Sequence, residues 1–370
     1  MDVKVFTIPG LEEEMTAFHE SYNIHHIVSA LDETPSPLKS KGERVCRFCG
    51  LANDASKFQN ISHLIPHQLG NNRLISDFEC DECNAFFGKF ENDLAYSLGM
   101  TRTIYKTKGK NKVPAFKSPN ELITAKINRD FGFESTEIKR KDTTVPNFLI
   151  NKETGQNSIS YIKNSYTPVH VYKVLLKIAL SLLPAEEVKN YQVPLGYLRR
   201  GNLEKEFSEF AKIFQYQMPL DHRLLAPTAF LFERRLPANR VPKHSFALYF
   251  ENFIYTFPIP FYEPDIKQNI YNGEEMIIPL CPPILTDKPQ GEIVYQRRLV
   301  DLSSNELLKG EKGFIQFNAD PEILKNLVAF DPVTGKVSSR ELNPDEIIGI
   351  HFVSPDSEIK FPPNNNSSLE

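Results

Sequence analysis

Four of the five cysteines in the chain form two CxxC pairs, Cys46–Cys49 and Cys80–Cys83. Two cysteines separated by two residues can both turn inward on one tight turn. Two such turns supply the four thiolates that a structural zinc ion takes in a tetrahedron. Gly50 follows the first pair and gives that turn its backbone freedom. We therefore expect the four thiols to form a closed, structural zinc site.

Disulfides and a redox-active pair are the alternatives to zinc. Disulfides need an oxidising compartment, and the opening residues MDVKVFTIPG lack the basic and apolar regions of a secretory signal. A thioredoxin-like pair is expected once, beside a strand–helix unit, and not twice. The doubled motif therefore favours zinc and a cytoplasmic location. The fifth cysteine, Cys281, is expected to be a small buried hydrophobic residue.

The loop between the pairs carries SHLIPHQLGNN, and the second pair leads directly into Asn84. A neutral imidazole such as that of His63 can take a proton from water near pH 7, as a general base must. On a helix that starts at the second pair, Asn84 and Glu91 lie on one face, and their oxygen atoms suit Mg²⁺ or Mn²⁺. Taken singly, each has a structural alternative: a packed histidine, a helix cap or a solvated glutamate.

Taken together, residues 44–98 resemble the HNH endonuclease family, the zinc-supported ββα-metal nucleases. The resemblance rests on CxxC, SHLIPHQLGNN and ECDECNAFFGKFENDL. It implies His63 on a first strand as the general base and Asn84 on the following helix as a ligand of the catalytic Mg²⁺ or Mn²⁺. It also implies a middle asparagine that holds the loop or the base, for which we take Asn72, with Asn71 next.

Position 62 departs from the family pattern. Many members have Asp or Glu there as a metal ligand, whereas this chain has Ser62. His67, Glu91 or water could complete the shell of the ion beside Ser62. The implied reaction is metal-assisted hydrolysis of phosphodiester bonds in DNA. Zinc would only hold the fold, because a site closed by four sulfur atoms leaves no open position.

The rest of the chain indicates how the domains are organised. A chain of 370 residues is expected to hold more than one domain. We expect an N-terminal helical segment and linker at 1–43, a zinc-stabilised ββα-metal nuclease module at 44–105, and a larger α+β accessory domain at 118–360. The fold class is therefore α+β.

Three segments outside the module have readable patterns. Residues 11–31 predict a helical stretch, and residues 169–191 predict a helix whose first part ends at Pro184. The apolar run of the second is too short to span a bilayer, so no membrane partner is expected. FALYFENFIYTF predicts a hairpin that turns at Glu251–Asn252.

Because the net charge is −4, any binding of nucleic acid must depend on a local cluster of basic residues. One basic run, residues 101–117, follows the predicted nuclease helix and contains no acidic residue. Its cationic residues are Arg102, Lys106, Lys108, Lys110, Lys112 and Lys117. The run either neutralises phosphates beside the site or is a solvated linker, and the sequence leaves both interpretations open.

The leading hypothesis is a cytoplasmic, metal-dependent HNH endonuclease acting on DNA. Each active site is expected to cut one DNA strand. Cleavage of both DNA strands therefore favours a homodimer, which carries two active sites. The accessory domain would bind a regulatory ligand or a protein partner, an architecture typical of effectors in bacterial anti-phage or restriction systems. The alternative is a non-catalytic, zinc-containing module that binds nucleic acid or protein. A nuclease that stays silent until a signal arrives would resemble that module in an assay.

Overall fold

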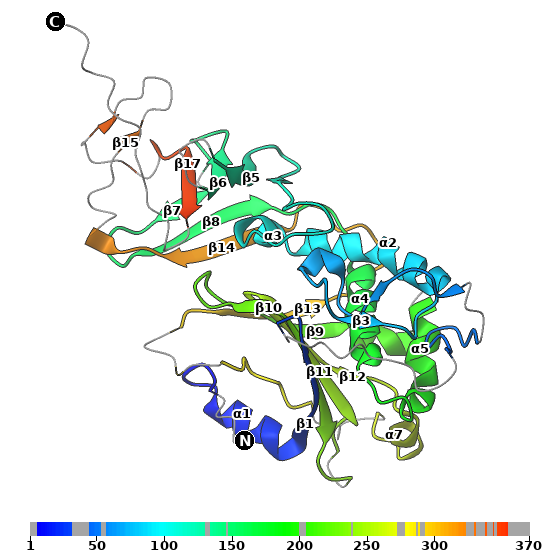
Figure 1. Cartoon of the computed structure of the whole chain (residues 1–370). Coiled ribbons are helices and arrows are strands. Elements are labelled where there is room, and N and C mark those ends of the chain that lie inside the picture. The colour runs from blue at the N-terminus through cyan, green and yellow to red at the C-terminus, as the bar shows by residue number, and fades with distance from the viewer. Residues whose placement is uncertain are drawn as a thin grey trace, which may run out of the picture. The chain divides into compact units, whose positions relative to one another are not determined.

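The protein is described by a computed structural model (Figure 1). The described residues are 6–31, 44–52, 57–129, 134–145, 147–199, 205–237, 240–271, 278–285, 288, 293–322, 329–330, 337–338, 343 and 346–353. They fall into two compact units, each made from segments that are separated in the chain. The first unit comprises Met1–Ala95, Tyr166–Met218 and His222–Leu308, and the second comprises Tyr96–Ser165, Pro219–Asp221 and Lys309–Glu370.

The first unit contains a six-stranded antiparallel sheet. In spatial order its strands are β1 (Tyr22–Ser29), β10 (Leu224–Arg234), β11 (His244–Glu251), β12 (Phe253–Ile259), β9 (Lys212–Gln217) and β13 (Gln296–Asp301). A separate pair is formed by β2 (Ser62–His63) and β3 (Ile75–Ser76). The helices are α1 (Glu12–Ser21), α2 (Asp81–Ser97), α4 (Pro168–Ser181), α5 (Gln192–Arg199), α6 (Lys205–Phe210) and α7 (Glu263–Lys267), with 3₁₀ turns η2 (His67–Leu69) and η3 (Val188–Tyr191).

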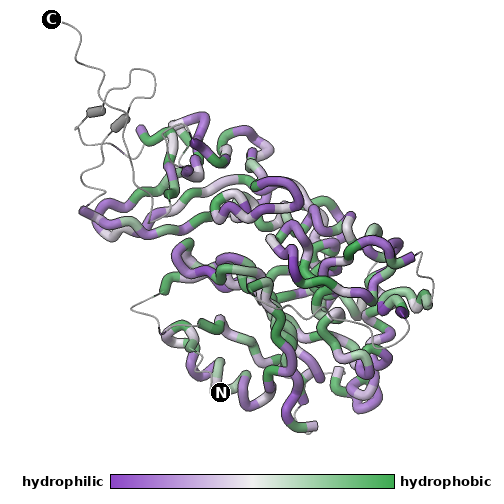
Figure 2. The backbone as a smooth tube through the Cα atoms, viewed as in Figure 1, coloured by the Kyte–Doolittle hydropathy of each residue, from purple (hydrophilic) through white to green (hydrophobic). Residues whose placement is uncertain are grey.

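The hairpin predicted from FALYFENFIYTF is confirmed as β11 and β12. Phe250 pairs with Phe253, and Glu251 at the turn has a positive φ of 50°. Nearly every residue of both strands is buried, because side chains alternate between two faces that are both covered. Figure 2 shows the resulting hydrophobic colouring of these central strands.

Helix α4 lies against this sheet and is the most deeply buried helix of the unit. Pro168 occupies its first turn, a position where the missing N–H costs nothing. All of its residues except His170 are buried, and the ring of Tyr172 lies 5.7 Å from that of Phe257 on β12. The helix ends at Ser181, so the prediction that it stops before Pro184 is confirmed.

The prediction of one helical stretch over residues 11–31 is only half right. Helix α1 ends at Ser21, and the chain continues directly into strand β1. Phe18 of α1 packs edge-on against Phe232 of β10, at 4.9 Å between ring centroids. Tyr22 to Ser29 pair with β10, and this tertiary pairing overrides the helical spacing read from sequence.

The second unit holds two further antiparallel sheets. One consists of β14 (Lys312–Asn318), β8 (Gln156–Ile162) and β7 (Phe148–Ile150), and the other of β17 (Gly349–Val353), β6 (Ser135–Arg140), β5 (Ile123–Asn128) and β4 (Phe116–Lys117). The pair β15 (Ala329–Phe330) and β16 (Val337–Ser338) and helix α3 (Thr101–Ile104) complete the unit. Its core includes Ile138, Ile159 and Tyr161. Gly313 packs against the Tyr161 ring, which fills the space that a side chain at this position would need.

The α+β class is confirmed, because both units combine helices with antiparallel sheets. The division into units does not follow the expected consecutive order of domains. Strand β1 precedes the cysteine-rich segment and pairs with β10, which follows it, so residues 44–95 share a unit with most of the region expected to be a separate accessory domain. The expected linker, TPSPLKSKGE at 34–43, and the end of the accessory domain at 354–360 lie outside the described residues. Among the described helices, none is long and apolar enough to cross a membrane.

Candidate metal centre and histidine site

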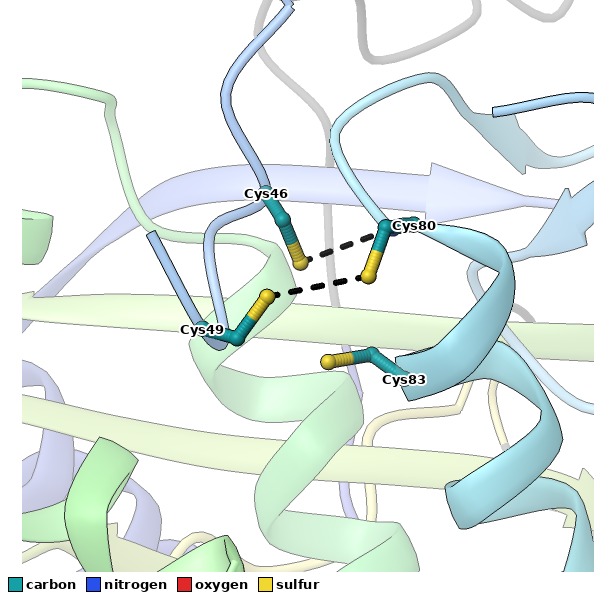
Figure 3. Close-up of side chains that lie close together, drawn as sticks. All are labelled: Cys46, Cys49, Cys80 and Cys83. Atoms are coloured by element: carbon teal, nitrogen blue, oxygen red, sulfur yellow. Dashed lines mark hydrogen bonds between the residues drawn. The ribbon is translucent and has the colours of Figure 1, made fainter. Parts of the chain in front are cut away.

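The four cysteines of the CxxC pairs converge in the first unit. Their sulfur atoms all lie within 4.8 Å of one another, and Figure 3 shows the side chains pointing toward a common centre. The Sγ atoms of Cys49 and Cys80 are 3.6 Å apart. A tetrahedral zinc ion with Zn–S bonds of 2.3 Å would place sulfur atoms about 3.8 Å apart. The group could therefore hold a metal ion such as zinc.

Local backbone structure explains why the two pairs turn inward. In the first turn, Gly50 N–H donates to the Cys46 carbonyl at 2.8 Å, and Gly50 has a φ of +73° that a side chain would strain. The second pair lies where α2 begins: Cys80 precedes the helix, and Asn84 N–H donates to its carbonyl at 2.9 Å. Cys80 N–H also donates to Cys46 Sγ at 3.4 Å, which links the two turns.

The thiols are free and crowd one another. A hydrogen bond with Cys83 is the main cause that lowers the pKa of Cys46 to about 4, and the same bond raises the pKa of Cys83. Four thiolates cannot share so small a volume without a cation to balance them. In the described part of the chain, this is the only group of three or more Cys, His, Asp or Glu side chains close enough together to hold an ion.

Arg47, inside the first CxxC turn, attaches the metal centre to the end of α4. Its Nη1 donates to the carbonyls of Leu180, Ser181 and Leu183 at 2.8, 2.8 and 3.0 Å. Its guanidinium lies 4.0 Å from the centre of the Phe78 ring, and burial lowers its pKa to about 10. A cation that caps the last carbonyls of a helix is favourable there.

His63 lies in the hairpin that separates the two CxxC pairs. Ser62 pairs with Ser76 and His63 with Ile75, and helix α2 follows. This is the strand, strand, helix order that the resemblance implies. The imidazole of His63 lies 5.0 Å from that of His67, nearly perpendicular to it. In the described residues, Nδ1 of each ring is buried and has no hydrogen-bond partner.

The pKa of His63 is lowered from its ordinary value of 6.5. Burial is the main cause, and the neighbouring His67 and Lys177 add to it. His63 is therefore neutral at pH 7, the protonation state that a general base requires.

The loop-holding role that we expected of Asn72 belongs to Asn71. The Asn71 side chain is fully buried. Its Nδ2 donates to the carbonyls of Ile65 and Leu74 at 2.7 and 2.9 Å, and its Oδ1 accepts from the N–H groups of Arg73 and Leu74. Asn72 is exposed. Sequence spacing did not distinguish the two asparagines, because the tight turn alone decides which side chain faces inward.

Ser62 is engaged by a glutamate that the sequence motifs did not single out. Its Oγ donates a short hydrogen bond to Oε2 of Glu79, the residue before Cys80. Lys177 Nζ of α4 lies 2.8 Å from the same oxygen and also donates to the His63 carbonyl at 3.3 Å. The side chains of Glu79 and Lys177 are only 1% and 2% exposed. An ion pair buried beneath the hairpin thus fixes the strand that carries His63.

Asn84 and Glu91 lie on α2, as predicted. Asn84 is half-buried in the first turn, and no hydrogen bond joins its side chain to His63 within the described residues. Glu91 interacts electrostatically with both Glu79 and Lys177. Burial raises the pKa of Glu91, the charge of Lys177 opposes that shift, and the charge of Glu79 adds to it.

The sequence of helix α4 contains a pattern of charged residues that could have predicted its polar contacts. His170, Lys173 and Lys177 interrupt an otherwise apolar helix at positions i, i+3 and i+7, which share one face. His170 Nδ1 lies 2.5 Å from Asp93 of α2. Lys173 lies 5.7 Å from the ring centre of Phe90. The charged face of α4 is therefore the face that contacts α2 and the hairpin.

The basic run at 101–117 belongs to the second unit. Lys106 pairs with Glu134 at 3.0 Å and Lys117 with Glu121 at 2.7 Å. Lys108, Lys110 and Lys112 are exposed. The run therefore contains three cations that solvent or a phosphate can reach.

No protein-family model, no curated protein and no solved structure matches the chain. A function for this protein must therefore be inferred from its own motifs and from the geometry of the site.

Proposed function

We propose that the protein is a metal-dependent HNH endonuclease that hydrolyses phosphodiester bonds in DNA. The observation that carries the proposal is the position of His63. This neutral imidazole lies on the first strand of a hairpin, between two CxxC turns whose thiols converge. Helix α2 begins at the second of these turns. The motif resemblance over residues 44–98 supports the same reaction.

In this proposal His63 takes the proton from the attacking water. Its lowered pKa keeps the ring able to accept that proton at neutral pH. Asn84 would hold the catalytic Mg²⁺ or Mn²⁺, with His67 and Glu91 as further candidates. Such an ion, when bound, polarises the phosphate and stabilises the leaving oxygen. Ser62 has a different role, because its hydroxyl holds Glu79. The zinc proposed for the four cysteines would be structural.

Plasmid cleavage tests the proposal. Purified protein is incubated with plasmid DNA and Mg²⁺ or Mn²⁺, beside the His63→Ala variant. His25→Ala serves as the matched control, because His25 is an exposed histidine on β1 of the same unit. We expect cleavage by the wild type and the control only. Equal cleavage by His63→Ala would remove His63 as the base.

The alternative function is a non-catalytic zinc module that binds nucleic acid or protein. The specific observation in its favour is Ser62, which stands where many HNH nucleases carry an acidic metal ligand. DNA binding without cleavage under either metal would support it. Exposed Lys108, Lys110 and Lys112 would serve DNA binding in both cases.

The wider biological role follows from the same proposal. We place the enzyme in the cytoplasm, because all five cysteines are free thiols. A homodimer would bring two sites to the two DNA strands, and a regulatory ligand or protein partner would act through the sheets outside the module. An effector of bacterial anti-phage or restriction defence would have this organisation. Cleavage that appears only after a phage-infected extract is added would identify a nuclease held silent until a signal.

A further inference from the structure

Glu79 has one satisfied and one unsatisfied carboxylate oxygen. Ser62 Oγ and Lys177 Nζ both bind Oε2. Within the described residues, Oε1 is buried and has no hydrogen-bond partner. A buried carboxylate oxygen without a partner costs free energy, so its retention points to a ligand that satisfies it.

The charge of Glu79 acts on a second carboxylate, that of Glu91. The charge of Lys177 also acts on Glu91. His63 contributes no charge at neutral pH because its pKa is lowered. Burial raises the pKa of Glu91, and a cation bound between the two carboxylates would favour the charged form of Glu91.

We propose that Glu79 Oε1, together with Glu91, binds the divalent cation of the site and so supplies the carboxylate that Ser62 lacks. This inference rests on the proposed function. Mg²⁺ and Mn²⁺ prefer oxygen ligands, and Mg²⁺ is typically held by one or two protein carboxylates with water in the remaining positions. Two glutamates are therefore enough. Ser62 and Lys177 are positioning residues, because they hold Oε2 and leave Oε1 to face the cation.

Binding of Mn²⁺ can be measured without any cleavage assay. The zinc-loaded full-length protein is titrated with Mn²⁺, with and without a short DNA duplex, and free Mn²⁺ is followed by its electron paramagnetic resonance signal. We expect one Mn²⁺ per chain, displaced by excess Mg²⁺. Glu79→Gln and Glu91→Gln should each weaken binding by about tenfold or more, because each removes a charged ligand.

Glu82→Gln is the matched control. Glu82 lies on α2 three residues after Glu79, but its side chain is 74% exposed and faces Lys57. Binding to this variant should equal that of the wild type. Zinc content and melting temperature show whether each variant is folded, and Glu91→Gln decides the question if Glu79→Gln does not fold.

Two results would overturn the inference. The wild type could show no Mn²⁺ beyond weak surface binding in either condition, or the folded glutamine variants could bind Mn²⁺ as tightly as the control. Neither result depends on nuclease activity. Tight Mn²⁺ binding that requires Glu79, in a protein that cleaves no DNA, would instead leave the cation site standing and remove the proposed reaction.

Discussion

At the scale of single residues, the site depends on side chains that hold backbone in place. Asn71 makes four hydrogen bonds to the loop between β2 and β3. The neighbouring Asn72 has the same chemistry but lies in solvent. Position in a tight turn, and not residue type, determines which of the two holds the loop that follows His63.

Replacement of Asn71 should therefore destabilise the protein, and replacement of Asn72 should not. Asn71→Ala leaves buried carbonyl and N–H groups without partners, so we expect a loss of about 2–4 kcal/mol in the free energy of unfolding. Asn72→Ala should change it by less than about 0.5 kcal/mol. Urea denaturation of both variants measures this, and equal values would contradict the role given to Asn71.

In the proposed reaction, the protonation of His63 predicts the pH dependence of cleavage. Burial holds its folded pKa below 6.5, so the ring stays neutral from high pH down through 6.5 and gains a proton only below that value. The rate should be retained at pH 6.5 and fall at lower pH. The same shift makes His63 destabilising in acid, because the unfolded chain binds the proton first. A cleavage rate already halved at pH 7 would contradict a neutral His63.

At the scale of elements, α4 unites the sheet and the cysteine-rich hairpin. One side of α4 packs on β12 through Tyr172. Its polar side provides Lys177 to Glu79, and Arg47 caps its final turn. The helix is therefore a structural part of the histidine site, although it lies about a hundred residues further along the chain.

Removing the charge of Lys177 alone should be more harmful than removing the whole ion pair. Lys177→Met leaves the Glu79 carboxylate buried and uncompensated, and we expect a loss of about 3–5 kcal/mol. The double variant Lys177→Met/Glu79→Gln should recover most of that stability. A double-mutant cycle from denaturant unfolding measures the coupling. Lys57→Met, at an exposed pair, is the control that should not change stability measurably. Additive effects of the two buried changes would contradict the pairing.

At the scale of the whole molecule, residues 44–95 are inserted within the first unit. Strand β1 precedes these residues in the sequence and strand β10 follows them, and the two strands pair with each other. The contacts of Arg47 and Lys177 attach residues 44–95 to α4. Changes in the metal centre should therefore reach α4 sooner than the central strands of the sheet, whose contacts are independent of the cysteines.

Removal of zinc tests this order. Metal analysis should find about one zinc ion per chain. After chelation, hydrogen exchange should accelerate first in residues 44–95, then at the C-terminal turn of α4, and last in β10 to β12, because the four thiols order the hairpin only when they share an ion. A chain that contains no zinc and shows full protection in residues 44–95 would contradict a structural metal.

The sequence alone determined the local features of this protein. The spacing of the cysteines predicted their convergence, which the structure confirms. The segment after Cys80 was correctly expected to be helical, and the β11–β12 hairpin was predicted with its turn. These features depend on ligand spacing, turn residues and periodicity, all of which act over a few residues and can be read directly from the chain.

Only the tertiary structure decided what surrounds His63. Glu79 and Lys177 form an ion pair across about a hundred residues, Asn71 replaces Asn72 as the loop support, and residues 22–29 join a sheet in place of the predicted helix. The physical reason is the same in each case. The burial of a side chain and the identity of its contacts depend on groups that are distant in sequence. The role of a charged side chain in an apolar helix can be assigned only when its oppositely charged partner is known.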